Sequence, residues 1–423
     1  MFTVALFGIF FLLALIGVPL ALSLAFGGIL PLSIFTDINP IVTIQRFFAA
    51  IDSYSLLAAP FYIISGGFLD KGGVSKRLVR MANALVGWLP GGLAVVTFLS
   101  CISGSSAATV VAIGSIMVPA MIREGYSRGF ALATIASGGW LGIIVPPSVP
   151  MVLYGTSAGA SVGEIFMGGF IPGFLLAFGM SVYSVLWGVK HRDQIMIQKF
   201  EIKEVFVALK DSFWALLMPI LILGGIYGGV FTPTEAAAVS IVYGLFVGFI
   251  VYKELDLKTL VIIVRDGIKT SSIIMLCIAA ASVFGYVMAM EMIPQKVANA
   301  IVALAETKLQ FWVLVSILLL IVGTFMDTPP AILILTPILT PVLPNYGISE
   351  VLFGIVMIVN LGIGLITPPV GLNLYIAANL LKVPVTEVLN IHLIGYLILA
   401  LILLIVFMAF PNIIMFLPNL MFS

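Results

Sequence analysis

Charged residues are scarce in this sequence. Lysine, arginine, aspartate and glutamate make up 9% of its 423 residues, whereas a soluble domain carries about 25%. A surface exposed to water cannot be built from so few charges, so a soluble globular protein is excluded. The formal net charge of +1 implies neither an acidic nor a basic partner, and nothing indicates binding to nucleic acid.

Cysteine and histidine are also rare, with two of each. Cys101 and Cys277 lie in apolar segments, which predicts buried thiols rather than a disulfide, and two thiols do not make a metal site. His191 and His392 lie at the ends of apolar segments and are expected to flank a membrane. No P-loop, HExxH or GxSxG motif occurs, so the sequence does not predict an enzyme.

Apolar residues dominate the composition instead. The sequence is 62% hydrophobic with a mean hydropathy of +1.25. Runs such as 2–30 and 393–410 are long enough to cross a hydrocarbon core of roughly 30 Å as helices. The first run lacks a basic start and is too long for a signal peptide. We expect an all-α multi-pass membrane protein with full spans near 4–30, 41–67, 130–158, 165–189, 213–231, 236–252, 270–290, 351–381 and 391–417.

Two further apolar segments, 88–120 and 311–341, are interrupted by small and polar residues. Basic loops are retained in the cytoplasm, and placing them there makes both segments re-entrant hairpins. The same map places the N-terminus inside, the C-terminus outside and an amphipathic helix near 293–310 on the outer surface. The basic loops that set this map are 71–80, 123–128, 190–210 and 253–269.

The two interrupted regions align with each other without a gap at a shift of 222 residues, at low overall identity over 97–150. The matched residues are mostly proline and glycine, which specify backbone shape. We predict a first unit at 1–190, a cytoplasmic linker and connecting span at 191–235, and a second unit at 236–423. The connecting span adds one crossing and inverts the second unit, as in secondary transporters. The matches are Pro119 with Pro341, Gly125 with Gly347, Ser127 with Ser349, Gly142 with Gly364, and 146–147 with 368–369.

Four breaks interrupt the helices of the two units, at 103–106, 142–148, 323–330 and 360–369. Unpaired backbone is costly in hydrocarbon, so broken helices line protein or water-filled cavities. Proline frees carbonyl groups, and serine and threonine add hydroxyl oxygens. Such oxygen cages suit a hard monovalent cation, for which Na⁺ is the expected occupant, and helix N-termini suit an anionic substrate. The alternative is that these small residues serve helix packing.

Asp327 is an acid in the middle of a long apolar segment. Burying a carboxylate at mid-membrane costs several kcal/mol, so such residues are usually functional. The alternative is a solvated acid at a wet hairpin tip. Its counterpart in the first unit is Ser105, so any role of the carboxylate is not duplicated.

The motifs at these breaks resemble those of a known family. SGSSA at 103–107, IVPPS at 144–148, MDTPPAIL at 326–333 and GLITPPVGLN at 364–373 are similar to the large membrane subunit of TRAP (tripartite ATP-independent periplasmic) transporters. The likeness extends along the whole chain and includes FYIISGGF at 61–68 and FTPTEAAA at 231–238.

The resemblance implies Na⁺-coupled uptake of an organic acid, such as a C4-dicarboxylate or sialic acid, across a bacterial inner membrane. It implies a periplasmic substrate-binding protein as a partner, and an elevator motion of the hairpins and broken spans against a scaffold. A small membrane subunit of about four helices is expected as a separate chain, because this sequence starts directly at its first repeat.

The resemblance also implies site residues, by matching motif. Substrate-binding residues would be Ser105, Ser148 and Asp327. One Na⁺ site would comprise Ser103, Ser106, Gly142, Val145 and Pro147, and the other Gly323, Thr328, Gly364, Thr367 and Pro369.

Other functions fit the sequence less well. A cation/proton antiporter would need several carboxylates at mid-membrane, a channel would need a repeated pore ring, and an enzyme would need a polar cluster at depth. A stand-alone secondary carrier differs from the first hypothesis by needing no binding protein. The sequence does not name the substrate, although Arg46 could approach a break.

Overall fold

The computed structural model describes residues 2–36, 38–39, 41–101 and 104–422, and these residues form helices without β-strands. Seven of the described helices are long and apolar enough to cross a membrane. An eighth candidate is the pair formed by α3 (Ile41–Ile51) and the segment Ser55–Lys71, which are bent by 62°. The expected all-α class is therefore confirmed.

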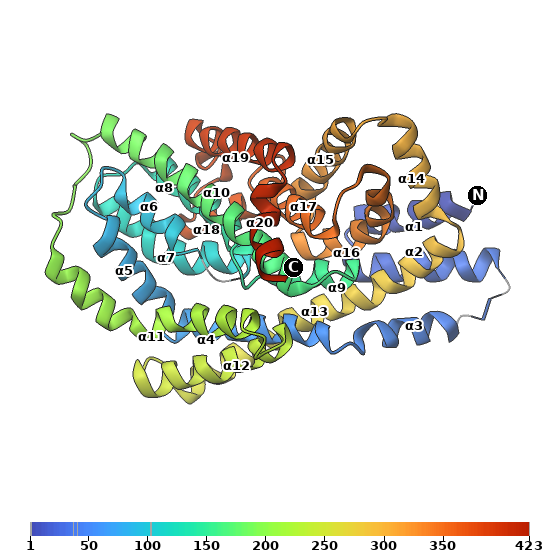
Figure 1. The fold of residues 1–423 in the computed structure, drawn as a ribbon, viewed down its shortest axis with the longest axis horizontal. Helices are drawn as coiled ribbons and strands as arrows, with labels where there is room; N and C mark the ends of the chain where they lie inside the picture. Colours follow the sequence, from blue (N-terminus) through green and yellow to red (C-terminus); the bar gives the residue numbers. More distant parts are fainter. Residues whose placement is uncertain (1, 37, 40, 102–103, 423) are drawn as a thin grey trace.

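Four helices form one side of the molecule, along the lower edge of Figure 1. α4 packs against both α12 and α13, and glycines permit the close approach. A Cβ at Gly267 would lie 2.6 Å from the side chain of Ile64, and one at Gly244 would lie 3.0 Å from that of Phe68. These helices are α4 (Ala58–Lys71), α11 (Ile202–Tyr227), α12 (Pro233–Phe246), which continues as the π-helix Val247–Val251, and α13 (Leu257–Met290).

The first predicted span, 4–30, is wrong. Gly17 has a φ of +87°, and the chain turns there between α1 (Phe2–Leu15) and α2 (Leu20–Phe35). The two helices run antiparallel, since the rings of Phe2 and Phe35 lie 5.9 Å apart. Both ends of this hairpin therefore lie on the same side of any membrane, which removes the reason for a cytoplasmic N-terminus.

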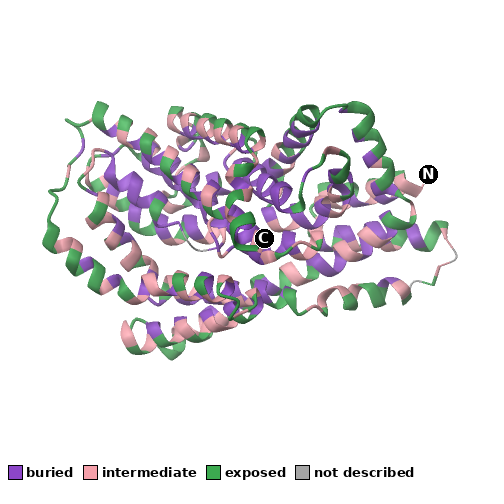
Figure 2. Ribbon diagram, in the orientation of Figure 1, coloured by how far each residue is buried: buried purple, intermediate pink, exposed green. Residues whose placement is uncertain are grey.

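The centre of the molecule consists of helix pairs and interrupted helices, where Figure 2 shows buried residues concentrated. The first unit supplies α6 (Gly92–Leu99), α7 (Ser106–Arg123), α8 (Arg128–Gly139), the 3₁₀ turn Trp140–Ile143 and α9 (Val149–Ala158). The second supplies α15 (Lys308–Phe325), α16 (Thr328–Leu339), the 3₁₀ turn Thr340–Tyr346, α17 (Glu350–Gly364) and α18 (Leu372–Leu381).

Outer helices hold this centre together. The hydroxyl of Tyr396 on α19 is fully buried and lies 2.7 Å from the hydroxyl of Ser184 on α10 and 3.1 Å from that of Thr134 on α8. Exposed Phe174, Phe178 and Ile398 give the outward faces an apolar surface. The outer helices are α10 (Val162–Lys190), α14 (Ile293–Leu304), α19 (Ile391–Ala409) and α20 (Asn412–Phe422), with a 3₁₀ turn at Val385–Glu387.

Helix starts in the two units match at the predicted shift. The side chains of Ser127 and Ser349 cap α8 and α17 by accepting from the amides of Phe130 and Leu352. α7 and α16 begin at Ser106 and Thr328, which also differ by 222. The helices therefore begin at matching positions, although the N-caps of α7 and α16 differ, since the side chain of Asp327 caps α16 and that of Ser105 makes no cap hydrogen bond to α7. The inverted orientation of the units stays a prediction.

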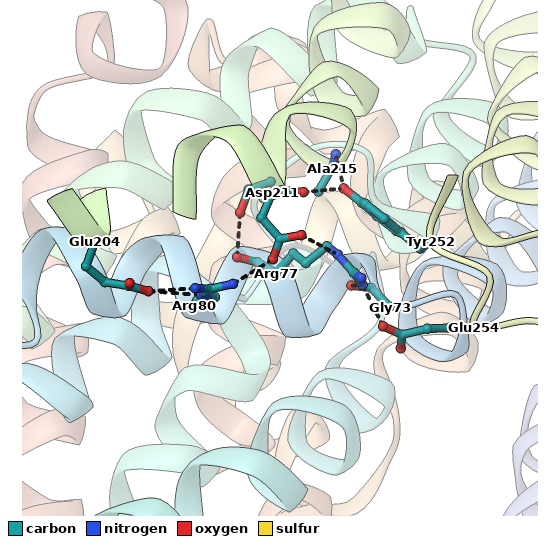
Figure 3. Close-up of polar contacts among 9 residues, drawn as sticks. Gly73, Arg77, Arg80, Glu204, Asp211, Ala215, Tyr252 and Glu254 are labelled. Atoms are coloured by element: carbon teal, nitrogen blue, oxygen red, sulfur yellow. Dashed lines mark hydrogen bonds and ion pairs between the residues drawn. The ribbon is translucent and has the colours of Figure 1, made fainter. Parts of the chain in front are cut away.

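An ion-pair network fixes α5 (Val74–Val86) to α11, as Figure 3 shows. Arg77 pairs with Asp211 at 3.3 Å and with Glu254 at 2.7 Å, and its guanidinium lies 3.6 Å from the centre of the Tyr252 ring. Arg80 pairs with Asp211 at 3.1 Å and with Glu204 at 2.9 Å. α5 leads directly into the first hairpin, so the network anchors the start of that hairpin.

The two cysteines are buried free thiols, as the sequence predicts.

Candidate functional site

The tip of the first hairpin contacts the break in the following span. The carbonyl of Gly104 accepts a hydrogen bond from the amide of Val149 at 3.2 Å. Gly104 has a φ of +76°, and a Cβ there would lie 2.9 Å from the carbonyl oxygen of Pro147. Only glycine adopts this conformation at such close range without strain. The hairpin tip and the carbonyls of the break therefore meet directly.

The second hairpin contacts its own break even more closely. The amide of Gly371 donates to the carbonyl of Thr324 at 3.0 Å. A Cβ on Gly364 would lie 2.4 Å from the carbonyl carbon of Gly323, which is backbone and cannot rotate away. The end of α15 thus lies against the end of α17 at van der Waals distance.

The two broken spans also pack against each other. Trp140, at the break after α8, is fully buried, and a Cβ on Gly362 of α17 would lie 2.6 Å from its ring. The two breaks therefore lie side by side in the interior, so a structural change at one break can affect the other.

A cavity of about 370 Å³ lies where the hairpin tips face α4 and α13. The hairpins contribute residues 104–108 and 327–329 to its lining, and α9 contributes Val149 and Pro150. The opposite wall carries polar groups of α4 and α13, namely Tyr62, Asp70, Lys71, Asp266 and Thr270. A cavity of this size between two groups of helices suits a small ligand.

Three carboxylates and one ammonium group line the described part of the cavity. The Asp70 carboxylate accepts from the Ser75 hydroxyl at 2.6 Å, and that of Asp327 accepts from the Thr328 amide at 2.7 Å. Asp266 pairs only loosely with Arg265, at 3.4 Å. Lys71 is the one cationic side chain among the described lining residues. The cavity is therefore acidic, which favours cations and opposes multiply charged anions unless cations accompany them.

Of the predicted substrate residues, Ser105 and Asp327 line this cavity. Ser148 is fully buried and is absent from the lining. Its hydroxyl donates to the carbonyl of Ile143 at 2.5 Å and accepts from the amide of Met151, so the side chain caps α9. The structure thus gives Ser148 a capping role, and its contact with substrate stays a prediction.

The predicted cation residues fall into two groups around the breaks. Ser106 and Thr328 both line the cavity. The hydroxyl of Thr367 donates to the carbonyl of Ile363 at 2.7 Å. Ser103 lies outside the described residues. Backbone positions of the breaks make up the rest: Gly142, Val145 and Pro147 in the first unit, and Gly323, Gly364 and Pro369 in the second.

The oxygen of Thr328 is suited to a cation. Thr328 is 1% exposed, and its hydroxyl oxygen is buried without a hydrogen-bond partner among the described residues. Burying an unpaired hydroxyl costs about 1–3 kcal/mol, so such a group usually has an occupant. No group of three or more histidine, cysteine or acidic side chains that could hold a metal occurs in the described part of the chain. The oxygen atoms near Thr328 belong to hydroxyl, carbonyl and carboxylate groups, which suit a hard cation better than a soft transition metal.

The polar residues on α4 and α13 were missed at the sequence level. Tyr62, Asp70 and Thr270 lie on helices that contain glycine but are not interrupted there, so no break marks these residues. Which face of such a helix meets the cavity depends on packing, so a single sequence carries no signal for it.

Interrupted helices around a polar cavity are typical of membrane transporters. Two solved transporters share the fold. The YdaH transporter of Alcanivorax borkumensis superposes with a TM-score of 0.63 at 15% identity, covering 88% of this chain and 87% of its own. MtrF of Neisseria gonorrhoeae gives 0.62 at 13% identity, covering 88% and 83%.

The chain belongs to the family described as the tripartite ATP-independent periplasmic transporter, DctM component, which matches residues 7–413. It is 37% identical to the C4-dicarboxylate large permease DctM of Rhodobacter capsulatus, over 98% of both chains. It is 36% identical to the sialic acid large permease SiaM of Vibrio cholerae, over 87% of both. It is 39% identical to the isethionate permease DctMQ of Oleidesulfovibrio alaskensis, over 92% of this chain and 62% of that protein's length.

Proposed function

We propose that this protein carries out Na⁺-coupled uptake of a small organic anion delivered by a periplasmic binding protein. The observation that carries the proposal is the shared cavity, into which both hairpin tips bring hydroxyl oxygens, Ser106 on one side and Thr328 on the other. The acidic lining supports cation coupling, because bound Na⁺ would offset the carboxylates and allow an anion to enter.

The substrate class follows from the relatives. Those named for C4-dicarboxylate, sialic acid, isethionate and 2,3-diketo-L-gulonate all take up an acid. We propose an acid of similar size for this chain, bound between the hairpin tips with Ser105 and Asp327 as contacts. Lys71 is a further contact for its anionic group.

The proposed mechanism is an elevator. The hairpins and broken spans would move as one body against the side formed by α4 and α11–α13, and the cavity lies at the boundary of these two groups. A second cavity of about 290 Å³ lies at the same boundary, lined by Ala50, Ser157, Ser282 and Gly285 among others.

The proposed setting is a bacterial inner membrane, with a small membrane subunit and a periplasmic binding protein as partners. The basic loops would face the cytoplasm. Because α1 and α2 fold back on each other, that arrangement puts the N-terminus on the periplasmic side, like residue 36.

The test is uptake into proteoliposomes that contain this chain, its small subunit and its binding protein. Labelled succinate, malate, sialic acid and isethionate would be offered with an inward Na⁺ gradient or with K⁺ in its place. We expect uptake of one acid that needs both Na⁺ and the binding protein. Uptake without the binding protein would indicate a stand-alone carrier.

The competing function is a cation/proton antiporter, which the three carboxylates of the cavity favour. Protonation of Asp70, Asp266 and Asp327 would then replace substrate binding. A pH-sensitive dye inside the same vesicles would detect proton release on adding Na⁺ without any acid. Such release, with no uptake of any acid by folded protein, would refute the symport proposal.

A further inference from the structure

Asn373 lies on α18, directly after the break of the second unit, and is fully buried. Its backbone amide donates to the carbonyl of Leu365, inside that break, at 3.1 Å. Its side chain reaches the other unit, where the hydroxyl of Ser106 donates to Oδ1 at 2.9 Å. Nδ2 donates to the carbonyl of Ala136 on α8 at 3.1 Å. One residue thus connects the second break with the tip of the first hairpin.

The surroundings fix the orientation of the Asn373 amide. The carbonyl of Ala136 can only accept, so it must face Nδ2, and Oδ1 must face Ser106. Oδ1 can only accept, so Ser106 must donate its one hydroxyl proton to it. The lone pairs of Ser106 then point away from that bond. A serine oxygen held in this way can act as a ligand for a cation, because its proton is committed elsewhere.

Neighbouring residues make room for this contact. A Cβ on Gly139 would lie 3.2 Å from Nδ2 of Asn373 and 2.2 Å from the side chain of Val110. A larger residue there would push Asn373 away from Ala136. The close approach of α18 to α7 and α8 therefore depends on the absence of a side chain at this position.

The second unit has no equivalent of this arrangement. The residue 222 positions before Asn373 is Met151, whose thioether is a weak acceptor. The hydroxyl of Thr328, the counterpart of Ser106, correspondingly has no partner among the described residues. Among the described residues, this hydrogen-bonded connection therefore joins the break of the second unit to the hydroxyl of Ser106 in the first unit, and the hydroxyl of Thr328 has no matching contact.

We propose that Asn373 is a positioning residue that couples the two cation sites, an inference that rests on the proposed Na⁺ coupling. A cation bound at the second break orders the backbone around Leu365, and this holds Asn373 in place. Asn373 then turns the oxygen of Ser106 toward the first site. Filling the second site thus raises the affinity of the first, and binding of Na⁺ is cooperative.

The experiment measures initial uptake against Na⁺ concentration in proteoliposomes with the complete transporter. For Asn373→Leu we expect the half-saturating Na⁺ concentration to rise roughly ten-fold, an effect of the size expected for the loss of one hydrogen bond. We also expect the Hill coefficient to fall toward one. Asn373→Asp keeps an acceptor for Ser106 but opposes the carbonyl of Ala136, so its half-saturating concentration should lie between those of Asn373→Leu and the unmodified protein. Asn379→Leu is the matched control, since Asn379 is exposed on the same helix.

A double variant separates this role from a purely structural one. If Asn373 acts through the proton of Ser106, adding Asn373→Leu to Ser106→Ala changes the Na⁺ dependence no further. Variants that transport too slowly are compared by the Na⁺-induced rise in melting temperature in detergent. Unchanged Na⁺ affinity and Hill coefficient in both Asn373 variants would overturn the inference. Uptake by the unmodified protein that ignores Na⁺ would instead refute the proposed function, and this inference with it.

Discussion

The two hairpin tips occupy equivalent positions but carry different chemistry. The first has Ser105 and Ser106, and the second has Asp327 and Thr328 at the positions 222 residues later. Ser106 is hydrogen-bonded to Asn373, whereas Thr328 has a buried hydroxyl without a described partner. The two tips therefore occupy matching backbone positions but differ in their side chains. The hydroxyl of Ser106 is held by a hydrogen bond, whereas that of Thr328 has no described partner and lies next to the carboxylate of Asp327.

The largest effect is expected from a methyl group at the break of the second unit. In Gly364→Ala the new Cβ would lie 2.4 Å from a backbone carbon of Gly323, so α15 and α17 must separate. In Gly142→Ala the Cβ would lie 2.4 Å from the hydroxyl of Thr109, a side-chain group that can rotate. We expect Gly364→Ala to abolish uptake and to destabilise the protein by about 1–3 kcal/mol or more, and Gly142→Ala to cost less.

Uptake and melting temperature would be measured together for both variants. Gly224→Ala, at an exposed position of α11, is the control, because nothing lies within 4 Å of a Cβ there. Equal losses in Gly364→Ala and Gly142→Ala would contradict the distinction between a rigid and an adjustable neighbour.

The next largest effect is expected from removing the charge of Asp327, which the tip of the first hairpin lacks. Asp327→Asn keeps the shape and the acceptor for the amide of Thr328 but removes the carboxylate from the cavity. We expect uptake efficiency to fall by about 10–100-fold, equivalent to about 1.4–2.7 kcal/mol. Asp193→Asn, in the exposed loop after α10, is the control. Undiminished transport by Asp327→Asn would remove the carboxylate from the mechanism.

A smaller effect is expected from removing the hydroxyl of Thr328. Thr328→Val keeps the volume and removes a buried oxygen that has no described partner. Without Na⁺ the variant should be more stable than the unmodified protein by about 1 kcal/mol, because an unsatisfied group is lost. Its half-saturating Na⁺ concentration should rise a few-fold. Greater stability together with unchanged Na⁺ dependence would mean that Thr328 is no cation ligand, and Thr328→Ser should retain Na⁺ binding.

The smallest effect is expected away from the tips, in the network on α5. The side chain of Arg77 is 16% exposed and contacts two carboxylates and a ring, whereas that of Arg80 is 44% exposed. We expect Arg77→Gln to destabilise the protein by about 1–3 kcal/mol and Arg80→Gln by less than about 1 kcal/mol. Thermal unfolding at low and high salt would measure both. Arg265→Gln, at a 66% exposed side chain, is the control.

The breaks could be predicted because their cause is local. Clusters of proline, glycine and polar residues predict the interruptions near Gly142, Gly323 and Gly364. A single proline does not suffice, since Pro172 lies inside α10 without ending it. The turn between α1 and α2 had the same kind of signal in Gly17 and Pro19, yet the long apolar run concealed it. Hydropathy reports that a segment is apolar but does not report that it folds back.

Side-chain roles were harder to predict. Ser148 is expected to contact substrate, which stays a prediction, and the structure adds that its hydroxyl caps α9 by accepting from the amide of Met151. Asn373 ends the motif at 364–373, but its contacts could not be predicted, because its partners lie 267 and 237 residues away. Such contacts exist only once the two units have packed together.

The anchoring of α5 also sets a limit on distance. Arg77 holds α5 to α11, and the hairpin helix α6 begins at Gly92, six residues after the end of α5 at Val86. A fully extended chain covers about 3.3–3.6 Å per residue, so this connection reaches roughly 20 Å at most. The connection therefore limits movement. As long as the guanidinium of Arg77 keeps its partners, the start of the first hairpin cannot move farther from α5 than the extended length of this connection.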